Sequence, residues 1–516
     1  MRPTASRVVS GVFLGTAAMA LIALPIHGRL ELAAEGSARV IAPPPPLAGV
    51  RSALAAEVRA GNAISLVVAV AQRGRVVWDE AFGWADREGR IAATPDTVYP
   101  IASLSKALTA TGVFLLVERG QVKTGDPVQR YLGSVRLRVF RTQEAAPTVS
   151  DILDMTGGIP HYWQYFWEPA AAPPPTTAEL LQRYGIVAFP PGRYFHYSNL
   201  SYAVAEQLIA QVSGTSFADF MRQRLLLPLG MTRTSLQIGP EPGNAVAVAY
   251  GLKARRWPRF DFYPKGGAGF YSTANDLLRF GQFHLHAQLA GGRKILAAPT
   301  IDSIHRLPPA HGAGRDYANG WGILEIGETK PALLADGEIL GAAATLLLLP
   351  SRDVAIVCMT NQNTKPRYSD AAAFKIADAL IPGFARKLEE LEAKADREDE
   401  VSMPLTPLAG DWDGEVQTYQ GALPVAMAIQ EDGGISVRLG NEAAAALERG
   451  HFNGSTLQGS LAGRLPAADT QALPHRLEIE LFVDKQEMMG TARAVSQGDT
   501  PGFGLPSYLA LRKRQP

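Results

Sequence analysis

The chain has 516 residues, of which 47% are hydrophobic and 19% are charged. That length allows roughly two to four domains, and the hydrophobic fraction is ordinary for a globular protein and excludes wholesale disorder. The 50 basic and 49 acidic residues leave a formal net charge of +1 and form no basic stripe, which argues against a nucleic-acid-binding protein.

The N-terminus has the sequence pattern of an export signal. Arg2 and Arg7 precede an apolar stretch at residues 8–26, and a run of mostly small residues follows at 33–38. This pattern is typical of a secretory signal peptide. Because about 18 apolar residues can also cross a bilayer, an uncleaved signal anchor is the alternative. We therefore expect residues 1–38 to be a signal peptide or signal anchor. The remainder would be exported, either periplasmic or anchored facing the periplasm, with any membrane association through residues 8–26.

The first predicted elements are a helix and a β-hairpin. Residues 47–59 are rich in Ala, Leu and Glu and predict a helix that ends at Gly61. Apolar runs at 64–71 and 76–82 flank a turn at 73–75, and together they predict two paired strands.

Strands of the same kind return much later. The runs at 345–349 and 354–360 flank a turn, so both ends of this region are expected to build one antiparallel sheet. The single cysteine, Cys358, is expected to be a buried strand residue. The segments in between predict helices, at 177–184, 200–212, 217–226 and 273–286. A helical region inserted into a sheet in this way creates a cleft at the junction.

A serine and a lysine stand at the start of a long apolar segment that ends at Gly120. Ser103 and Lys106 are three positions apart, so at a helix start their side chains share one face and the hydroxyl can meet the amine. Unpaired N–H groups and the helix dipole at that end favour negative charge on the serine oxygen. This is the arrangement of an activated nucleophile beside its base. Two fixed residues alone are a weak signal, because one chance match is expected in a chain of this length.

A second group follows a turn at Pro190-Pro191-Gly192. Tyr197 and Asn199 are two apart and would project together from a loop. A phenol can exchange a proton with a leaving group, and an amide can position the lysine and the substrate carbonyl. The alternative is a surface turn with a packed tyrosine.

Taken together, Ser103, Lys106, Tyr197 and Asn199 resemble the motifs of the serine β-lactamase and penicillin-binding protein superfamily, in its class C β-lactamase-like branch with esterases and D-amino-acid peptidases. Flanking motifs agree in order and spacing: Pro190-Pro191-Gly192, Pro228-Leu229-Gly230-Met231, Gly266-Gly267-Ala268-Gly269, 272–277 and Asn319-Gly320-Trp321-Gly322. The resemblance covers roughly residues 50–385.

The resemblance implies an α+β fold, with an antiparallel sheet flanked by helices and an inserted helical subdomain, over residues 39–385. It implies that Ser103 is acylated, that Lys106 and Tyr197 handle protons, and that Asn199 positions the substrate. The N–H of Ser103 would form half of an oxyanion hole and the last-strand motif the other half. The substrate would be a small-molecule or peptide-like acyl compound, and no metal or organic cofactor is implied.

The last-strand motif departs from the family. Where a lysine or histidine usually precedes one residue and a glycine, the chain has Ala335-Asp336-Gly337-Glu338. Gly337 and Glu338 are expected to contact the substrate, but Ala335 supplies no cation, and Asp336 and Glu338 would repel a substrate carboxylate. This favours an esterase or a related hydrolase of neutral acyl groups. Two alternatives stay open: a non-hydrolytic penicillin-recognising or acyl-binding protein, or a β-lactamase or D-aminopeptidase whose cation is substituted, with Lys265 as one candidate.

Several further residues allow two interpretations. The loop at 154–160 lacks the histidine and serine that the branch more often has around Thr156. His196 could tune Tyr197 or simply pack, and the HxH pair His284 and His286 would point apart on a helix and lacks a third metal ligand. The aromatic residues could line an acyl pocket or pack the helical subdomain: Tyr162, Trp163, Tyr165, Phe166 and Trp167.

After helices at 370–380 and 384–400, the composition changes to short alternating strands. We expect a charged helical linker at 386–403 and a separate small all-β, barrel-like domain at 404–516. Its Gly410-Asp411-Trp412 opening resembles lipocalin-like barrels appended to β-lactamase-like hydrolases. Such a barrel could hold a lipid-like group or serve as a structural or docking module.

Overall fold

The computed structural model describes residues 40–140, 145–168, 173–236, 246–286, 294–308, 315–399, 402–471 and 473–515. The expected signal segment at residues 1–38 lies outside these ranges. Within them, no helix combines the length and the apolar character that a bilayer crossing requires.

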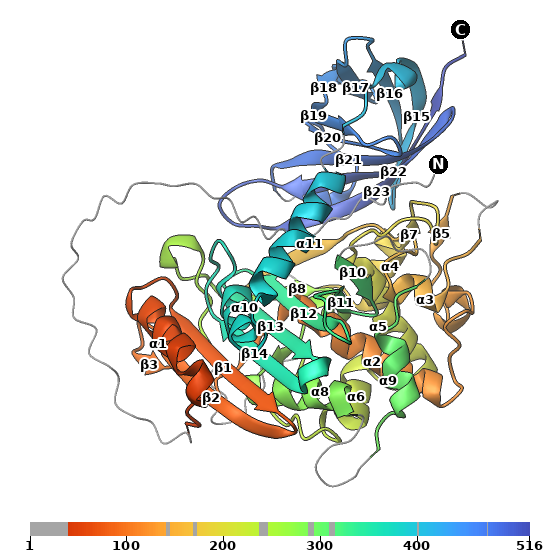
Figure 1. Ribbon diagram of the computed structural model, residues 1–516. Helices are drawn as coiled ribbons and strands as arrows, with labels where there is room; N and C mark the ends of the chain where they lie inside the picture. The colour runs from red at the N-terminus through yellow and green to blue at the C-terminus, as the bar shows by residue number, and fades with distance from the viewer. Residues whose placement is uncertain are drawn as a thin grey trace.

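The central element is an eight-stranded antiparallel sheet (Figure 1). Its order is β10-β11-β12-β13-β14-β1-β2-β3. The bounds are β1 Ser65–Gln72, β2 Arg75–Asp86, β3 Ile91–Ala92, β10 Arg315–Ala318, β11 Trp321–Leu324, β12 Ala332–Ile339, β13 Ala342–Leu349 and β14 Val354–Thr360. Val68 of β1 pairs with Cys358 of β14. This join confirms that the two ends of the region form one sheet, with Cys358 buried inside it.

Both faces of this sheet are covered. Alternate side chains of β1 pack against α1 (Pro45–Arg59), α10 (Tyr368–Leu380) and the start of α11 (Phe384–Asp399), namely Leu66, Val68 and Val70. The intervening side chains face the helical region, namely Val67, Ala69 and Ala71. Because both sets are buried, the strand appears in the sequence as a continuous apolar run with no polar alternation.

The inserted region is mostly helical and surrounds α2. The remaining helices are α2 Ser105–Glu118, α3 Val149–Leu153, α4 Thr177–Tyr184, α5 Asn199–Ser213, α6 Phe217–Met221, α7 Lys265–Ala268, α8 Ala274–His286 and α9 Ala298–Ile304. Residues 105–116 of α2 are all buried, as the apolar pattern predicted. The helix expected at 217–226 is α6 followed by one π-helical turn at Arg222–Leu226.

The C-terminal part is a second antiparallel sheet that curls into a barrel-like shape and nearly closes (Figure 1). Its strands are β15 Gly410–Thr418, β16 Gly421–Ile429, β17 Ile435–Leu439, β18 Ala445–Ala446, β19 Glu448–Phe452, β20 Thr456–Leu461, β21 His475–Asp484, β22 Glu487–Ser496 and β23 Phe503–Lys513. Trp412 is fully buried, and its Nε1 donates to the Leu408 carbonyl at 2.9 Å. The architecture confirms the predicted α+β class with a small all-β addition.

The two parts are joined more closely than expected. The aromatic segment, for which lining an acyl pocket and packing the helical subdomain were both open, forms a strand, β6 (Trp163–Trp167). This strand pairs with β23 on one side and with β8 (Phe260–Tyr263) on the other. The C-terminal sheet therefore continues across the domain boundary into the hydrolase-like region. The start of the expected linker is also part of the core, because Leu388 of α11 is buried beside Phe384.

Candidate active site

Ser103 lies in a 3₁₀ turn, Ala102–Leu104, that runs directly into α2. The sequence predicts it in the first turn of the α-helix itself. Ala102 adopts a left-handed φ of 48°, a conformation that costs a non-glycine residue on the order of 1 kcal/mol and persists only where the surroundings hold it. Lys106 stands in the first turn of α2, and its Nζ lies 3.0 Å from Ser103 Oγ.

Tyr197 and Asn199 reach the same place from the start of α5. Ser198 caps that helix by accepting from the Ser201 N–H at 2.9 Å, and its hydroxyl donates to the Pro160 carbonyl at 2.8 Å. Tyr197 Oη consequently lies 2.5 Å from Ser103 Oγ. The structure thus brings together all four polar residues that the sequence motifs singled out.

The neighbours of Lys106 indicate which form of its amine the site holds. Nζ lies 2.6 Å from Asn199 Oδ1, 2.8 Å from the Gly267 carbonyl, 2.8 Å from Tyr197 Oη and 3.0 Å from Ser103 Oγ. The amide and carbonyl oxygens can only accept, whereas the two hydroxyls can also donate. A neutral amine can donate its two N–H bonds to the two acceptors and turn its lone pair to the hydroxyls, whereas an ammonium would donate its third N–H bond to one hydroxyl. Burial favours the neutral amine, because it holds the pKa of Lys106 well below its usual value.

The Gly267 carbonyl is a site group that sequence reasoning missed. It belongs to α7, which two hydrogen bonds hold in place. The Thr109 hydroxyl donates to the Gly266 carbonyl at 2.8 Å, and the Gly266 N–H donates to Glu206 Oε2 at 2.7 Å. A Cβ on Gly267 would lie 3.2 Å from the Asn199 carbonyl oxygen. The glycine run was visible in the sequence, but its role depends on this packing against α5.

The last-strand motif lies directly beside Ser103. Among the described strands, β11 pairs with β12 only over Ala332–Leu334, so the edge of β12 that carries Gly337 faces the 3₁₀ turn instead of another strand. A Cβ on Gly337 would stand 2.5 Å from Ser103 N and 2.8 Å from Leu104 N. Only a glycine allows this strand to approach the nucleophile so closely.

Ala335 supplies no cation, but a cation from another element lies at this end of the site. Arg367, just before α10, lines the cleft and forms ion pairs of 2.5 Å with Asp336 and 2.8 Å with Asp370. The two carboxylates hold the pKa of the Arg367 guanidinium above its usual value against the effect of burial. Because one cation serves two carboxylates, the group carries no surplus positive charge. Lys265 is not the substitute, since it pairs with Asp261.

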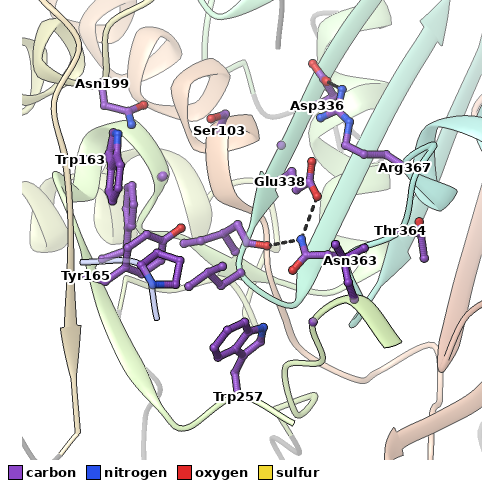
Figure 2. A pocket seen from close by; sticks show the side chains of 18 of the residues that line it. Ser103, Trp163, Tyr165, Asn199, Trp257, Asp336, Glu338, Asn363, Thr364 and Arg367 are labelled. Carbon is purple, nitrogen blue, oxygen red and sulfur yellow. Dashed lines mark hydrogen bonds and ion pairs between the residues drawn. The ribbon is translucent and has the colours of Figure 1, made fainter. Parts of the chain in front are cut away.

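The cleft around these residues has a volume of about 880 Å³ (Figure 2). Ser103 and Asn199 lie at one end, and Asp336, Glu338 and Arg367 line the strand side. Asn363 donates to Glu338 Oε1 at 2.8 Å. The opposite wall is aromatic, made by Trp163, Tyr165, Trp257 and Phe262. Part of the predicted aromatic group therefore lines the pocket, whereas Tyr162 is buried in the core and Phe166 packs on Tyr263.

His161 also lines the cleft and was not singled out from the sequence. Its Nδ1 lies 3.4 Å from the Asn199 N–H, which can only donate, so the proton of the neutral ring is at Nε2. Burial holds the pKa of His161 well below its usual value. The ring is therefore an uncharged neighbour of Tyr197, whose ring centroid lies 5.4 Å away.

The three histidines that the sequence singled out, His196, His284 and His286, have structural contacts. His196 stacks on Phe189 with ring centroids 3.9 Å apart, as the packing interpretation expected. His284 and His286 do point apart: the first lies 3.0 Å from His305, and the second pairs with Asp353. No cluster of three potential metal ligands occurs in the part of the chain that the structure describes.

Comparisons with known proteins agree with this geometry. A family model described as "Beta-lactamase" matches residues 50–381. Penicillin-binding protein 4* of Bacillus subtilis (strain 168) is 24% identical over 351 residues, which cover 64% of this chain and 74% of that protein.

Two solved structures share the fold. The octameric penicillin-binding protein homologue from Pyrococcus abyssi has a TM-score of 0.56 at 17% identity, covering 90% of this chain and 100% of that chain. EstCE1, described as a hydrolase with promiscuous acyltransferase activity, has a TM-score of 0.52 at 20% identity, covering 65% of this chain and 98% of that chain. The likeness to the Pyrococcus abyssi protein therefore extends well beyond the matched family region.

Proposed function

The chain belongs to the beta-lactamase family of serine hydrolases, and from that premise we propose that it hydrolyses esters or related neutral acyl compounds through an acyl-Ser103 intermediate. The observation that carries the proposal is the buried amine of Lys106. It lies within hydrogen-bond distance of two oxygens that can only accept, from Asn199 and Gly267, and of the hydroxyls of Ser103 and Tyr197. A buried neutral amine within hydrogen-bond distance of a serine hydroxyl is a general base beside its nucleophile.

In the first half-reaction, Ser103 Oγ attacks the acyl carbon and the carbonyl electrons move to oxygen. The hydroxyl proton passes to Lys106 Nζ, either directly or through Tyr197 Oη, which lies 2.5 Å from Oγ and 2.8 Å from Nζ. When the tetrahedral intermediate collapses, the bond to the leaving alkoxide breaks and the alkoxide takes up that proton. Burial raises the pKa of the Tyr197 phenol, so it relays the proton in its neutral form.

In the second half-reaction, water attacks acyl-Ser103 and gives its proton to the same amine. The bond between the acyl carbon and Ser103 Oγ then breaks, and the serine regains the proton. In both steps the negative oxygen would be stabilised by the N–H of Ser103 and by an N–H on the free edge of β12 beside Gly337. The close approach of that edge to Ser103 supports this assignment.

The preference for neutral acyl groups follows from charge. Asp336 and Glu338 line the cleft next to Ser103, and Arg367 is shared between Asp336 and Asp370. A substrate carboxylate would have to compete with both for the guanidinium.

The position of Arg367 also favours a second candidate, a β-lactamase or D-aminopeptidase in which this arginine replaces the missing cation of the last-strand motif. Hydrolysis of a β-lactam or of a peptide ending in D-alanine, faster than hydrolysis of neutral esters, would support that candidate instead.

The proposal is tested by intact-protein mass spectrometry after exposure to a fluorophosphonate, together with release of p-nitrophenol from short-chain esters. Wild type should gain one adduct and turn over, and Ser103→Ala should do neither. Ser105→Ala is the matched control, because this neighbouring buried serine accepts only from the Phe270 N–H at 3.2 Å and should leave labelling intact. One equivalent of p-nitrophenol followed by no turnover would instead indicate a non-hydrolytic acyl-binding protein.

A further inference from the structure

The C-terminal domain contributes residues to the catalytic cleft. Asp499 and Pro501 line the same cavity as Ser103 and Tyr197. They belong to the loop at residues 497–502, which connects β22 to β23. The sequence predicts a separate domain here, and no motif in the loop indicates that it reaches the site.

The loop is held against the hydrolase-like region by direct hydrogen bonds. The Tyr165 N–H donates to the Gly502 carbonyl at 2.7 Å, and Trp167 Nε1 donates to the Pro501 carbonyl at 3.0 Å. From its own side, Ser496 Oγ accepts from the N–H groups of Gly502 and Phe503, both at 2.9 Å. On the other flank, the Gln497 N–H donates to the Pro474 carbonyl at 2.7 Å. Because both ends of the loop are bonded, the wall is held in place before a substrate binds.

The same domain also shapes the aromatic wall. Gly504 of β23 pairs with Trp163 of β6, and a Cβ on Gly504 would lie 2.7 Å from Cε2 of the Trp163 ring. The indole can pack flat on the strand only because residue 504 has no side chain. Trp163 in turn lines the cleft. The placement of this wall therefore depends on β23 as well as on β6.

Asp499 gives this wall a charge. Its carboxylate side chain is exposed and lines the cleft. Glu338, also exposed, lines the strand side, and the cations Arg255 and Lys365 line the cleft as well. Because the cleft contains both acidic and basic side chains, one carboxylate changes the relative affinity for cationic and anionic substrates. The neighbouring aromatic faces also attract cations.

We infer that the loop at 497–502 is a substrate-contacting wall supplied by the C-terminal domain, and that Asp499 favours acyl substrates bearing a protonated amine over those bearing a carboxylate. This inference rests on the proposed function, since it concerns the substrates that reach Ser103. It makes the C-terminal domain a part of the active site and not only a docking module.

The test compares wild type, Asp499→Asn and Asp499→Lys on three p-nitrophenyl esters of equal length: ε-aminocaproyl, hexanoyl and adipoyl monoester. The ratio of kcat/KM for the cationic over the anionic ester should fall about 3- to 10-fold in Asp499→Asn and further in Asp499→Lys, since one unit charge is removed and then reversed. The change should shrink in high salt. The neutral ester should change less than about twofold, which separates a charge effect from a structural one.

Asp432→Asn is the control, because Asp432 is exposed in the turn between β16 and β17 of the same domain. It should leave all three esters unchanged. A cationic-to-anionic ratio that stays constant in both Asp499 variants would overturn the inference while leaving the hydrolase intact. Failure of the fluorophosphonate to label Ser103 in wild type would instead overturn the proposed function, and this inference with it.

Discussion

The close approach of β12 to the nucleophile makes Gly337→Ala the sharpest test of the site. The new methyl carbon would stand 2.5 Å from Ser103 N and 2.8 Å from Leu104 N, and it would also meet the Ile101 carbonyl. All three are backbone atoms and cannot rotate away. Optimal non-bonded separations are about 3.5 Å, so β12 and the 3₁₀ turn would have to part by about 1 Å.

A displacement of that size should damage catalysis far more than folding. A misplacement of about 1 Å between reacting groups can cost about 100-fold in rate. Overpacking of this kind costs about 1–3 kcal/mol of stability, which a domain of this size can tolerate. We therefore expect Gly337→Ala to remain folded, with kcat/KM for p-nitrophenyl esters and the rate of fluorophosphonate labelling both reduced by about two orders of magnitude.

Gly49→Ala is the matched control for this experiment. A Cβ at Gly49 in α1 meets nothing within 4 Å, so the helix should gain up to about 1 kcal/mol while activity stays unchanged. Thermal unfolding of both variants separates a local from a global effect. If Gly337→Ala keeps its labelling rate within about threefold of wild type, the strand edge does not define the oxyanion site and the reasoning fails.

Further predictions concern three buried titratable residues. Lys106→Met should slow labelling of Ser103 by about 100- to 10,000-fold, since the general base is lost. The pKa of Lys106 in the folded protein lies below its value of 10.5 in the unfolded chain, so between these two pH values the unfolded chain binds more protons. The unfolding free energy of wild type relative to Lys106→Met should therefore rise with pH in that interval. A difference in urea-denaturation free energy that does not change with pH would contradict this. Arg367→Leu leaves the carboxylates of Asp336 and Asp370 without their shared cation and should cost about 3–5 kcal/mol in chemical denaturation, and a loss below about 1 kcal/mol would show that the ion pairs matter little. Burial raises the pKa of Asp154 from 3.8 to about 7, so between these pH values the folded carboxyl holds a proton that the unfolded one has lost. The stability of Asp154→Asn relative to wild type should therefore increase as pH rises from 4 to 7, by up to about 4 kcal/mol. A stability difference that does not change with pH would refute the assignment.

Much of the fold was predictable because it depends on local patterns. Strands β1 and β14 are buried on both faces and helix α2 is buried on all sides. Such burial requires consecutive apolar residues, which can be recognised in the sequence. The strand β6 was not predicted, because a short run of aromatic residues does not distinguish a strand from a loop until its partner strands are known. Its partners, β8 and β23, lie far along the chain.

The same division holds at the site. The sequence by itself determined the juxtaposition of Ser103 and Lys106, because an interval of three at a helix start sets their geometry locally, and the family spacing added Tyr197 and Asn199. Only the tertiary structure decided that Lys106 is buried among four oxygens, that Arg367 stands beside Asp336, and that a loop carrying Asp499 reaches the cleft. The physical reason is that protonation, ion pairing and pocket walls depend on which distant segments pack together. Such contacts leave no periodicity or spacing in the chain, whereas a helical turn does.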